Sequence, residues 1–307
     1  MNYVRLLSFI LFSFLFCFDA AAESNKQGNI QYAGLRRSSY SCEKRNPKLC
    51  KDHAWWAKRA QEFADSIGGD HEVQPVIIEI VSIYLSGTCE MEFEKPTTYT
   101  GDIKGIDNFN PNASIDHEQA LLTYDRLGVK AILQIESGNA NVLACLDILN
   151  EAFGHHPCII GYGVDAEWYF AKESKDKTGR PIKDEDVKRW VDKVTSFNPS
   201  YTLFLKHWET SHMPPTFRDD HLWFLNDSQG FKNSTKMLKE FQAWGDVYKN
   251  EVVGFQFGYK KDRKWWSKME QPAKEIAEKL QKDIPNTKFL FWVDFTADSI
   301  RFSNETK

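Results

Sequence analysis

The feature that most constrains the fold is a regular alternation of short apolar runs with segments of helical periodicity. The runs are rich in β-branched and aromatic residues, and they are nearly continuous rather than strictly alternating. Such runs are typical of parallel strands that are covered by helices. We expect eight strands, at residues 30–35, 76–85, 131–135, 158–168, 202–208, 222–225, 252–257 and 288–295.

Amphipathic segments lie between these runs. Val187, Trp190 and Val194, for example, fall on one face of a helix. Only the connection at residues 209–220 is too short for a full helix. Eight strand–helix repeats in a chain of this length predict a single-domain (β/α)8 TIM barrel. The polar segments 87–117 and 172–186 are expected to be excursions over its top face.

The first 22 residues have the pattern of a cleavable signal peptide. Arg5 ends a short basic region, residues 6–18 are apolar, and residues 20–22 are small. No later stretch reaches the ~18 apolar residues that a membrane span needs. We therefore expect a secreted protein in which residues 23–307 form the barrel domain, with no membrane partner after the signal is removed.

Secretion would place the cysteines in an oxidising compartment, where disulfides form. Proximity predicts a bond between Cys42 and Cys50, and a helix-to-strand turn favours a second between Cys145 and Cys158. Cys89 is then left over. Glycosylation motifs fit the same route, with acceptors at Asn112, Asn226, Asn233 and Asn304.

Composition excludes several partners. The net charge of −4 argues against nucleic acid, which requires a basic patch. No spacing of His, Cys and Asp is typical of a metal site, so neither a metal nor a cofactor is expected. The pair His155–His156 precedes the fourth strand, at the end of the barrel opposite to the usual site. Glu79 lies within an apolar run and should pair with Lys or Arg.

The fourth run carries the strongest functional signal. In barrels of this type, function gathers at the carboxyl ends of the strands. Asp165 and Glu167 are two residues apart there, so that on a strand both side chains would face the same way. Mutual repulsion and burial would raise the pKa of one carboxyl, as a general acid requires. We therefore predict Glu167 and Asp165 as the catalytic pair, the alternative being two solvated carboxylates.

The other strand ends add polar and aromatic side chains. Sugars bind to such mixtures, because hydroxyls pair with planar polar groups while C–H faces stack on rings. The sequence thus favours a poly- or oligosaccharide partner. The candidate binding residues are Gln134, Glu136, Trp168, Asn226, Gln256, Tyr259, Trp292 and Asp294.

These motifs resemble the chitinase-type barrels of glycoside hydrolase family 18. The family signature Asp-Gly-x-Asp-x-Asp-x-Glu falls on residues 160–167, where Gly161, Asp165 and Glu167 match and Ile160 and Gly163 replace two aspartates. Residues 129–138 are similar to the third strand of that family, and residues 291–294 to its strand with a pocket-floor Trp. A weaker resemblance links the Asp-x-Glu pair to the lysozyme-type barrels of family 25.

The resemblance implies roles for three residues. Glu167 would protonate the glycosidic oxygen, and Asp165 would orient a substrate acetamido group that acts as internal nucleophile. Trp292 would lie beneath the reacting sugar.

The sequence leaves three candidate functions to compare. A secreted glycosidase is favoured by the retained Glu167. A chitinase-like lectin that has lost turnover is the alternative, favoured by Ile160 and Gly163. A metal-dependent phosphodiesterase is disfavoured, because the first strand ends in Arg36, Arg37 and Ser38 rather than in paired histidines.

Overall fold

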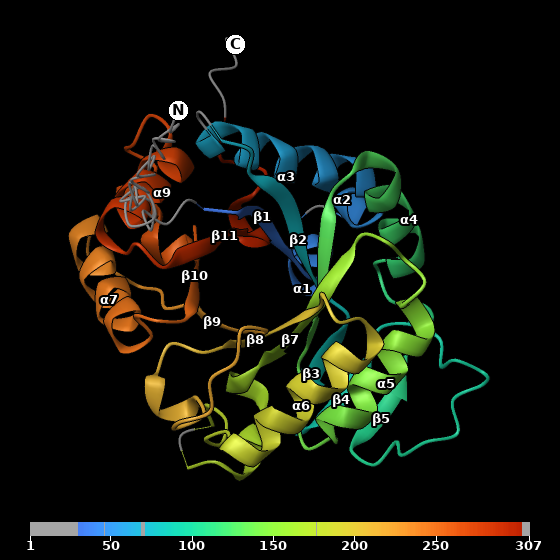
Figure 1. Cartoon of the computed structure of the whole chain (residues 1–307). Helices are drawn as coiled ribbons and strands as arrows, with labels where there is room; N and C mark the ends of the chain where they lie inside the picture. Colours follow the sequence, from blue (N-terminus) through green and yellow to red (C-terminus); the bar gives the residue numbers. More distant parts are fainter. Residues whose placement is uncertain (1–29, 46, 69–70, 176, 303–307) are drawn as a thin grey trace, which may run out of the picture.

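Eight parallel strands close into a barrel, which confirms the predicted single-domain (β/α)8 fold (Figure 1). The computed structural model describes residues 30–302 apart from 46, 69–70 and 176. The predicted signal peptide, residues 1–22, and the predicted acceptor Asn304 lie outside the described residues. In the order in which they pair around the barrel, the strands are β1 (Tyr32–Arg37), β11 (Thr287–Val293), β10 (Val252–Phe257), β9 (Leu222–Asn226), β8 (Thr202–Lys206), β7 (Ile159–Asp165), β6 (Lys130–Ile135) and β2 (Gln74–Ile80).

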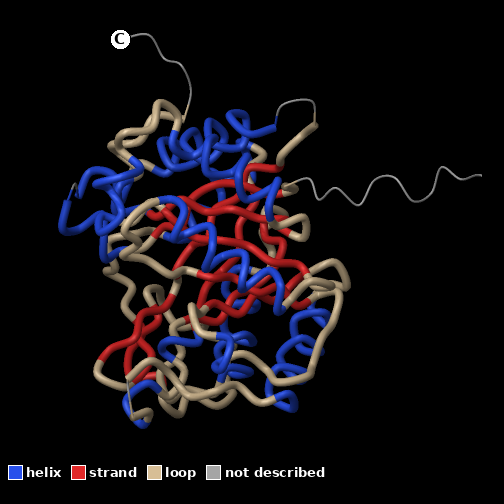
Figure 2. Tube along the Cα trace, turned by 90° about the vertical axis from the view of Figure 1, so that its left-hand side faces the viewer, coloured by secondary structure: helices blue, strands red, loops and turns tan. Residues whose placement is uncertain are grey.

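Helices surround these strands, which gather at the centre of the molecule (Figure 2). Between β8 and β9 the described chain forms only a 3-10 turn, Thr210–His212, as the short connection predicts. No helix in the described part of the chain is both long and apolar enough to cross a bilayer. The helices are α1 (Ser39–Arg45), α2 (Pro47–Lys51), α3 (His53–Gly68), α4 (His117–Leu127), α5 (Val142–Phe153), α6 (Asp184–Phe197), α7 (Ser234–Val247), α8 (Arg263–Trp266) and α9 (Pro272–Asp283).

Helix α4 shows how local sequence sets the element boundaries. Asp116 begins the helix, and its side chain accepts a hydrogen bond from the backbone N–H of Gln119. Gly128 ends it with φ of 70°, a left-handed conformation that glycine adopts without steric cost.

The interior of the barrel is packed with side chains and is not a pore. Val76, Ile78, Ile132, Phe204 and Phe291 belong to one buried cluster inside it. The glycine at position 163 faces this cluster, and a Cβ there would lie 2.1 Å from the ring of Phe204. Phe204 therefore occupies the space that a side chain at position 163 would need.

The predicted excursion after β2 contains structure of its own. It holds a three-stranded sheet made of β3 (Ser82–Leu85), β4 (Thr88–Met91) and β5 (Ile106–Phe109) (Figure 1). The sequence suggested a single strand over 76–85, but β2 ends at Ile80 and the chain then pairs with β4 instead. Ser86 and Gly87, both with positive φ, form the turn between β3 and β4.

One predicted disulfide is present and the other is wrong. Cys42 and Cys50 are bonded and link α1 to α2. Cys145 and Cys158 are free and buried. Because Cys145 lies in the first turns of α5 and Cys158 beyond its end, roughly 12 Å of helix separates them. Instead, Cys145 contacts Cys89, and Cys158 donates to the carbonyl of Leu121.

Candidate functional site

A cluster of charged side chains lies at the carboxyl ends of the barrel strands, where sequence analysis places the site. We call it the mouth cluster, and it consists of Glu136, Asp165, Glu167, Lys206 and Asp227. Strand β7 ends at Asp165, and a 3-10 turn, Ala166–Trp168, follows at once. The prediction that Asp165 and Glu167 share the face of one strand is therefore wrong in its geometry. The turn nevertheless keeps the two residues together, because Asp165 accepts a hydrogen bond from the backbone N–H of Glu167 at 3.3 Å.

Lys206 connects two carboxylates of the mouth cluster. It lies opposite Asp165 in the pairing of β7 with β8. Its Nζ is 2.7 Å from Oδ2 of Asp165 and 3.4 Å from Oδ2 of Asp227. Gln134 also donates to Oδ2 of Asp165, at 3.4 Å. Lys206 and Asp227 are not among the candidate binding residues chosen from the sequence, although the alternation along β8 puts Lys206 on the same face as the interior residue Phe204.

Glu136, which the sequence analysis gives as a binding residue, is a buried member of the mouth cluster. Its Oε2 accepts hydrogen bonds from the hydroxyl of Tyr40 at 2.7 Å and from the backbone N–H of Tyr84 at 2.9 Å. Burial and the nearby charge of Asp165 raise the pKa of Glu136 to about 7. Neither tyrosine was found from the sequence: Tyr40 lies beyond the first expected strand, and the contact of Tyr84 depends on the turn of the chain after Ile80, which the expected strand over 76–85 did not include.

Glu167 is the partly exposed carboxyl of the mouth cluster. Burial, followed by the charges of Asp165 and Asp227, raises its pKa to about 8. Burial also raises the pKa of Asp165, while the ammonium group of Lys206 opposes that rise. The cluster therefore places a protonated carboxyl beside an ion-paired carboxylate at neutral pH.

An aromatic pair borders the mouth. Trp168, a predicted binding residue, stacks on Tyr84 from β3 with ring centroids 4.8 Å apart and planes 20° apart. Both rings are partly exposed. Together they offer an apolar platform of the kind on which sugar rings stack.

Trp292 does not lie at the floor of the mouth, so that prediction is wrong. Phe291 fills the barrel interior, and alternation along β11 therefore turns Trp292 to the outer layer. The indole is fully buried there, and its Nε1 donates to Thr296 at 2.8 Å.

Gln256 and Tyr259 lie where the sequence analysis expects them, and they hydrogen-bond to each other. Tyr259 is close enough to Lys206 and Asp227 for their charges to affect its pKa, which burial raises. Gln256 Oε1, Gln134 Oε1 and Asp227 Oδ1 are buried without a hydrogen-bond partner among the described residues. These oxygens are potential acceptors for hydroxyl donors.

Asn226 and Asp294 are held by the protein itself. Both oxygens of Asp294 are engaged, one by Arg36 at 2.6 Å and the other by Ser38 at 2.6 Å. Asn226 accepts a hydrogen bond from the backbone N–H of Ser228, and only 1% of its surface is exposed. This burial contradicts the prediction of a glycan on Asn226 and gives a ligand little access to it.

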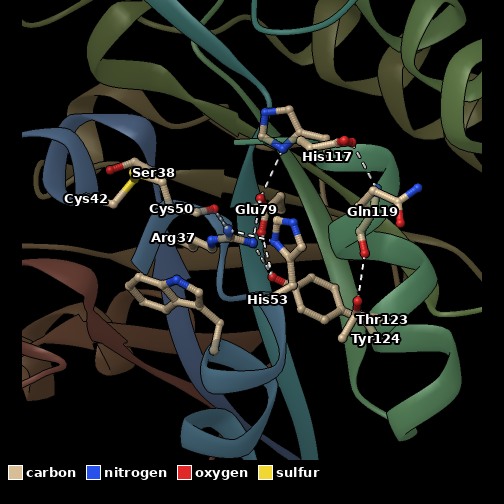
Figure 3. A network of polar contacts seen from close by, with 12 residues as sticks. Arg37, Ser38, Cys42, Cys50, His53, Glu79, His117, Gln119, Thr123 and Tyr124 are labelled. Atoms are coloured by element: carbon tan, nitrogen blue, oxygen red, sulfur yellow. Dashed lines mark hydrogen bonds and ion pairs between the residues drawn. A yellow bond between two sulfur atoms is a disulfide. The ribbon is translucent and has the colours of Figure 1, made fainter. Parts of the chain in front are cut away.

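A second buried network surrounds Glu79 on the outer side of β1 and β2 (Figure 3). We call Arg37, Glu79, His117 and Tyr124 the Glu79 network. Glu79 is 3.4 Å from Arg37 and accepts hydrogen bonds from His117 and Tyr124, both at 3.0 Å. Burial alone would raise the pKa of Glu79, but Arg37 and the two hydrogen bonds lower it below its usual value. The expected partner of Glu79 is thus confirmed as an arginine.

A cavity among the described residues lies outside the mouth. Its volume is about 860 Å³, and its walls include Glu92, Asp116, His117 and Phe153. The carboxyls of the mouth cluster do not line it.

Comparisons with known proteins show limited similarity. No protein-family model matches the chain, and no curated protein matches it either. Among solved structures, an endo-fucoidan hydrolase of glycoside hydrolase family 107 is 10% identical with a TM-score of 0.47, over 87% of this chain and 86% of that one. An alpha-amylase from Lactobacillus plantarum is 10% identical with a TM-score of 0.45, over 88% and 71%.

A 4-O-alpha-L-rhamnosyl-beta-D-glucuronidase from Fusarium oxysporum is 9% identical with a TM-score of 0.44, over 87% of this chain and 63% of that one. All three TM-scores are below 0.5. These similarities therefore assign neither family 18 nor any other family to the chain.

Proposed function

We propose that the protein is a glycoside hydrolase with Glu167 as general acid and Asp165 as the assisting carboxylate. The observation that carries this proposal is the position of Glu167. Its carboxyl is partly exposed at the barrel mouth, and its raised pKa of about 8 keeps it protonated at neutral pH. A general acid requires both properties, since it must reach the leaving group and hold a proton to donate.

In the proposed reaction, the Glu167 carboxyl transfers its proton to the glycosidic oxygen as the bond from that oxygen to the anomeric carbon breaks. Positive charge then develops on the sugar ring. The carboxylate of Asp165, which Lys206 and Gln134 hold in place, stabilises that charge or orients a substrate acetamido group against the anomeric carbon. The oxygen of a water molecule then bonds to the anomeric carbon, and the ionised Glu167 takes up the proton that this water releases.

The surroundings of the pair suit a sugar. The Tyr84–Trp168 platform offers a surface for a ring face, and the unpartnered oxygens of Gln134 and Gln256 can accept hydroxyl hydrogen bonds. We propose a poly- or oligosaccharide substrate. Glycans that contain N-acetylated hexosamines are the first class to test, because of the resemblance to family 18.

The test is release of reducing ends from chitin oligomers, peptidoglycan and galactosamine-containing polymers. Glu167→Gln should lower the rate by about 100-fold or more, because general acid catalysis contributes about that factor. Glu173→Gln is the matched control, since Glu173 lies in the loop that follows and its side chain is 53% exposed in an ion pair with Arg180. Equal loss in both variants, or no loss in either, would contradict the role of Glu167.

A carbohydrate-binding protein without turnover is the second candidate, and one observation favours it. The ring of Phe204 fills the space at Gly163, where family 18 enzymes carry an aspartate. This aspartate cannot be restored without moving Phe204. If the wild type and Glu167→Gln bind one glycan with equal affinity and neither releases reducing ends, the binding function replaces the enzymatic one.

We further propose that the protein is secreted after removal of residues 1–22. Asn112 and Asn233 are exposed and remain candidate glycan acceptors. Sequencing of the amino terminus of the exported protein tests the cleavage site, and a mass shift on treatment with an amide-cleaving glycosidase tests the glycans.

A further inference from the structure

Three potential metal ligands meet on the outside of the barrel, away from the mouth. Glu118 lies in the first turn of α4, while His155 and His156 lie in the turn between α5 and β7. Their ligand atoms all lie within 4.8 Å of one another. Oε2 of Glu118 is 3.2 Å from Nε2 of His156, and Oε1 of Glu118 is 3.4 Å from Nε2 of His155.

His156 is held as a metal-binding histidine usually is. Its side chain is buried, and its Nδ1 is 2.6 Å from Oδ2 of Asp125. The other oxygen of Asp125 accepts the backbone N–H of Cys158 at 2.7 Å. Because a carboxylate can only accept, Nδ1 donates to Asp125, and Nε2, which faces Glu118, is the ring nitrogen that remains to bind an ion. Such a carboxylate–histidine pair fixes ring orientation and raises the basicity of the ligand.

The spacing of the ligand atoms suits a tetrahedral ion. With metal–ligand bonds of about 2.0–2.2 Å, neighbouring ligands of a tetrahedral site lie about 3.3–3.6 Å apart. Nε2 of His156 and Nε2 of His155 lie close to this range from Glu118, at 3.2 Å from Oε2 and 3.4 Å from Oε1, and one ligand atom from each residue lies within 4.8 Å of the other two. His155 and Glu118 are 60% and 43% exposed at their side chains, so an ion enters from solvent and water can complete the coordination.

We propose that Glu118, His155 and His156 bind a zinc ion, with Asp125 as the positioning residue of His156. Two imidazoles with one carboxylate suit zinc, whereas calcium and magnesium prefer sites made of oxygens. The sequence analysis expects no metal, because the two histidines precede a strand and so lie at the end of the barrel opposite to the usual site.

The ion would join α4 to the turn that precedes β7. Asp165 lies at the opposite end of β7, seven residues or roughly 20 Å along the strand. The zinc site therefore anchors the beginning of this strand and takes no part in the chemistry at its end. Its test does not depend on the activity proposed for the mouth.

The experiment is a zinc titration of the untagged, chelator-treated protein by calorimetry, together with thermal melting. We expect one zinc per chain and a melting temperature that rises with zinc. His155→Ala, Glu118→Gln and His156→Ala should each weaken binding by at least about 100-fold, since loss of an outer partner alone costs about 10–100-fold. Asp125→Asn should weaken zinc binding by the smaller factor, about 10–100-fold. His155→Ala is the most informative, because its exposed side chain can be removed without unfolding the protein.

His71→Ala is the matched control, because His71 lies outside the cluster and should bind zinc as the wild type does. Cobalt in place of zinc should give the visible absorption of a four-coordinate site in the wild type but not in His155→Ala. Equal zinc affinity in the wild type and His155→Ala would overturn the proposal. So would a lower number of zinc ions per chain in His71→Ala than in the wild type.

Discussion

The mouth cluster and the Glu79 network are built from the same kinds of residues but differ in their balance of charge. In the Glu79 network one carboxylate meets one arginine and two further donors, and its pKa is lowered. In the mouth cluster four carboxyls surround Lys206, and the pKa values of Glu136 and Glu167 rise to about 7 and about 8.

The difference shows how burial can serve two purposes in one barrel. Compensated charges stabilise a fold only modestly, but they are costly to separate. An excess of one sign instead forces a group to keep a proton at neutral pH, and this is the condition of a general acid. We therefore interpret the Glu79 network as structural and the mouth cluster as functional.

The largest expected effect is on the structural side of this comparison. Glu79→Gln leaves Arg37 with an uncompensated buried charge and should lower the free energy of unfolding by about 3–5 kcal/mol. Urea denaturation measures this, with the exposed Glu72→Gln as control. If the free energy of unfolding falls by less than about 1 kcal/mol, the Glu79 network is not the stabilising, charge-balanced counterpart of the mouth cluster.

The pH dependence of activity tests the functional role of the mouth cluster. Glu167 must be protonated to donate, and its pKa is about 8. We expect kcat/KM to decline about tenfold per pH unit above that value, and to be insensitive to Glu167 well below it. A rate profile from pH 5 to 10 checks this. A rate that keeps rising beyond pH 9 would exclude Glu167 as the acid.

Gly163→Ala tests whether the floor beneath the mouth cluster is rigid. The new methyl group would meet the buried ring of Phe204, so the variant should be destabilised by about 1–3 kcal/mol. Thermal and urea unfolding measure the change. A neutral outcome would mean that Phe204 moves easily and that a side chain at position 163 can be accommodated.

The linkage between the protonation of Glu167 and folding gives a further test of the raised pKa. Its folded pKa of about 8 is above the ordinary value of 4.5, so the folded state binds the proton more tightly. This contribution is fully present below about pH 4.5 and is lost as pH rises through about 8. Relative to Glu167→Gln, the wild type should thus lose stability between pH 5 and 8. Parallel stability curves for the two proteins would contradict the raised pKa.

Much of the fold follows from the sequence, because buried parallel strands produce continuous apolar runs that are hard to mistake. All eight runs became strands of the barrel. The direction of single side chains was less predictable. The resemblance to a strand with a pocket-floor Trp placed Trp292 in the mouth, whereas the alternation along β11 puts its side chain in the outer layer.

The composition of the site was predicted only in part. Asp165, Glu167, Glu136 and Gln134 follow from the rule that function gathers at strand ends. The contribution of Tyr84 could not be predicted, since it depends on how the excursion after β2 folds back. The wrong pairing of Cys145 with Cys158 has a similar origin, because the expectation of a bond across the helix-to-strand turn did not account for the length of α5.

Tyr84 has a consequence for how such a protein can change over time. Its ring forms half of the aromatic platform, and its backbone N–H holds Glu136. The ring can be exchanged for other side chains by mutation, whereas a backbone N–H persists through every substitution except proline. Ligand preference at this position can therefore diversify while the position of the carboxyl is inherited unchanged.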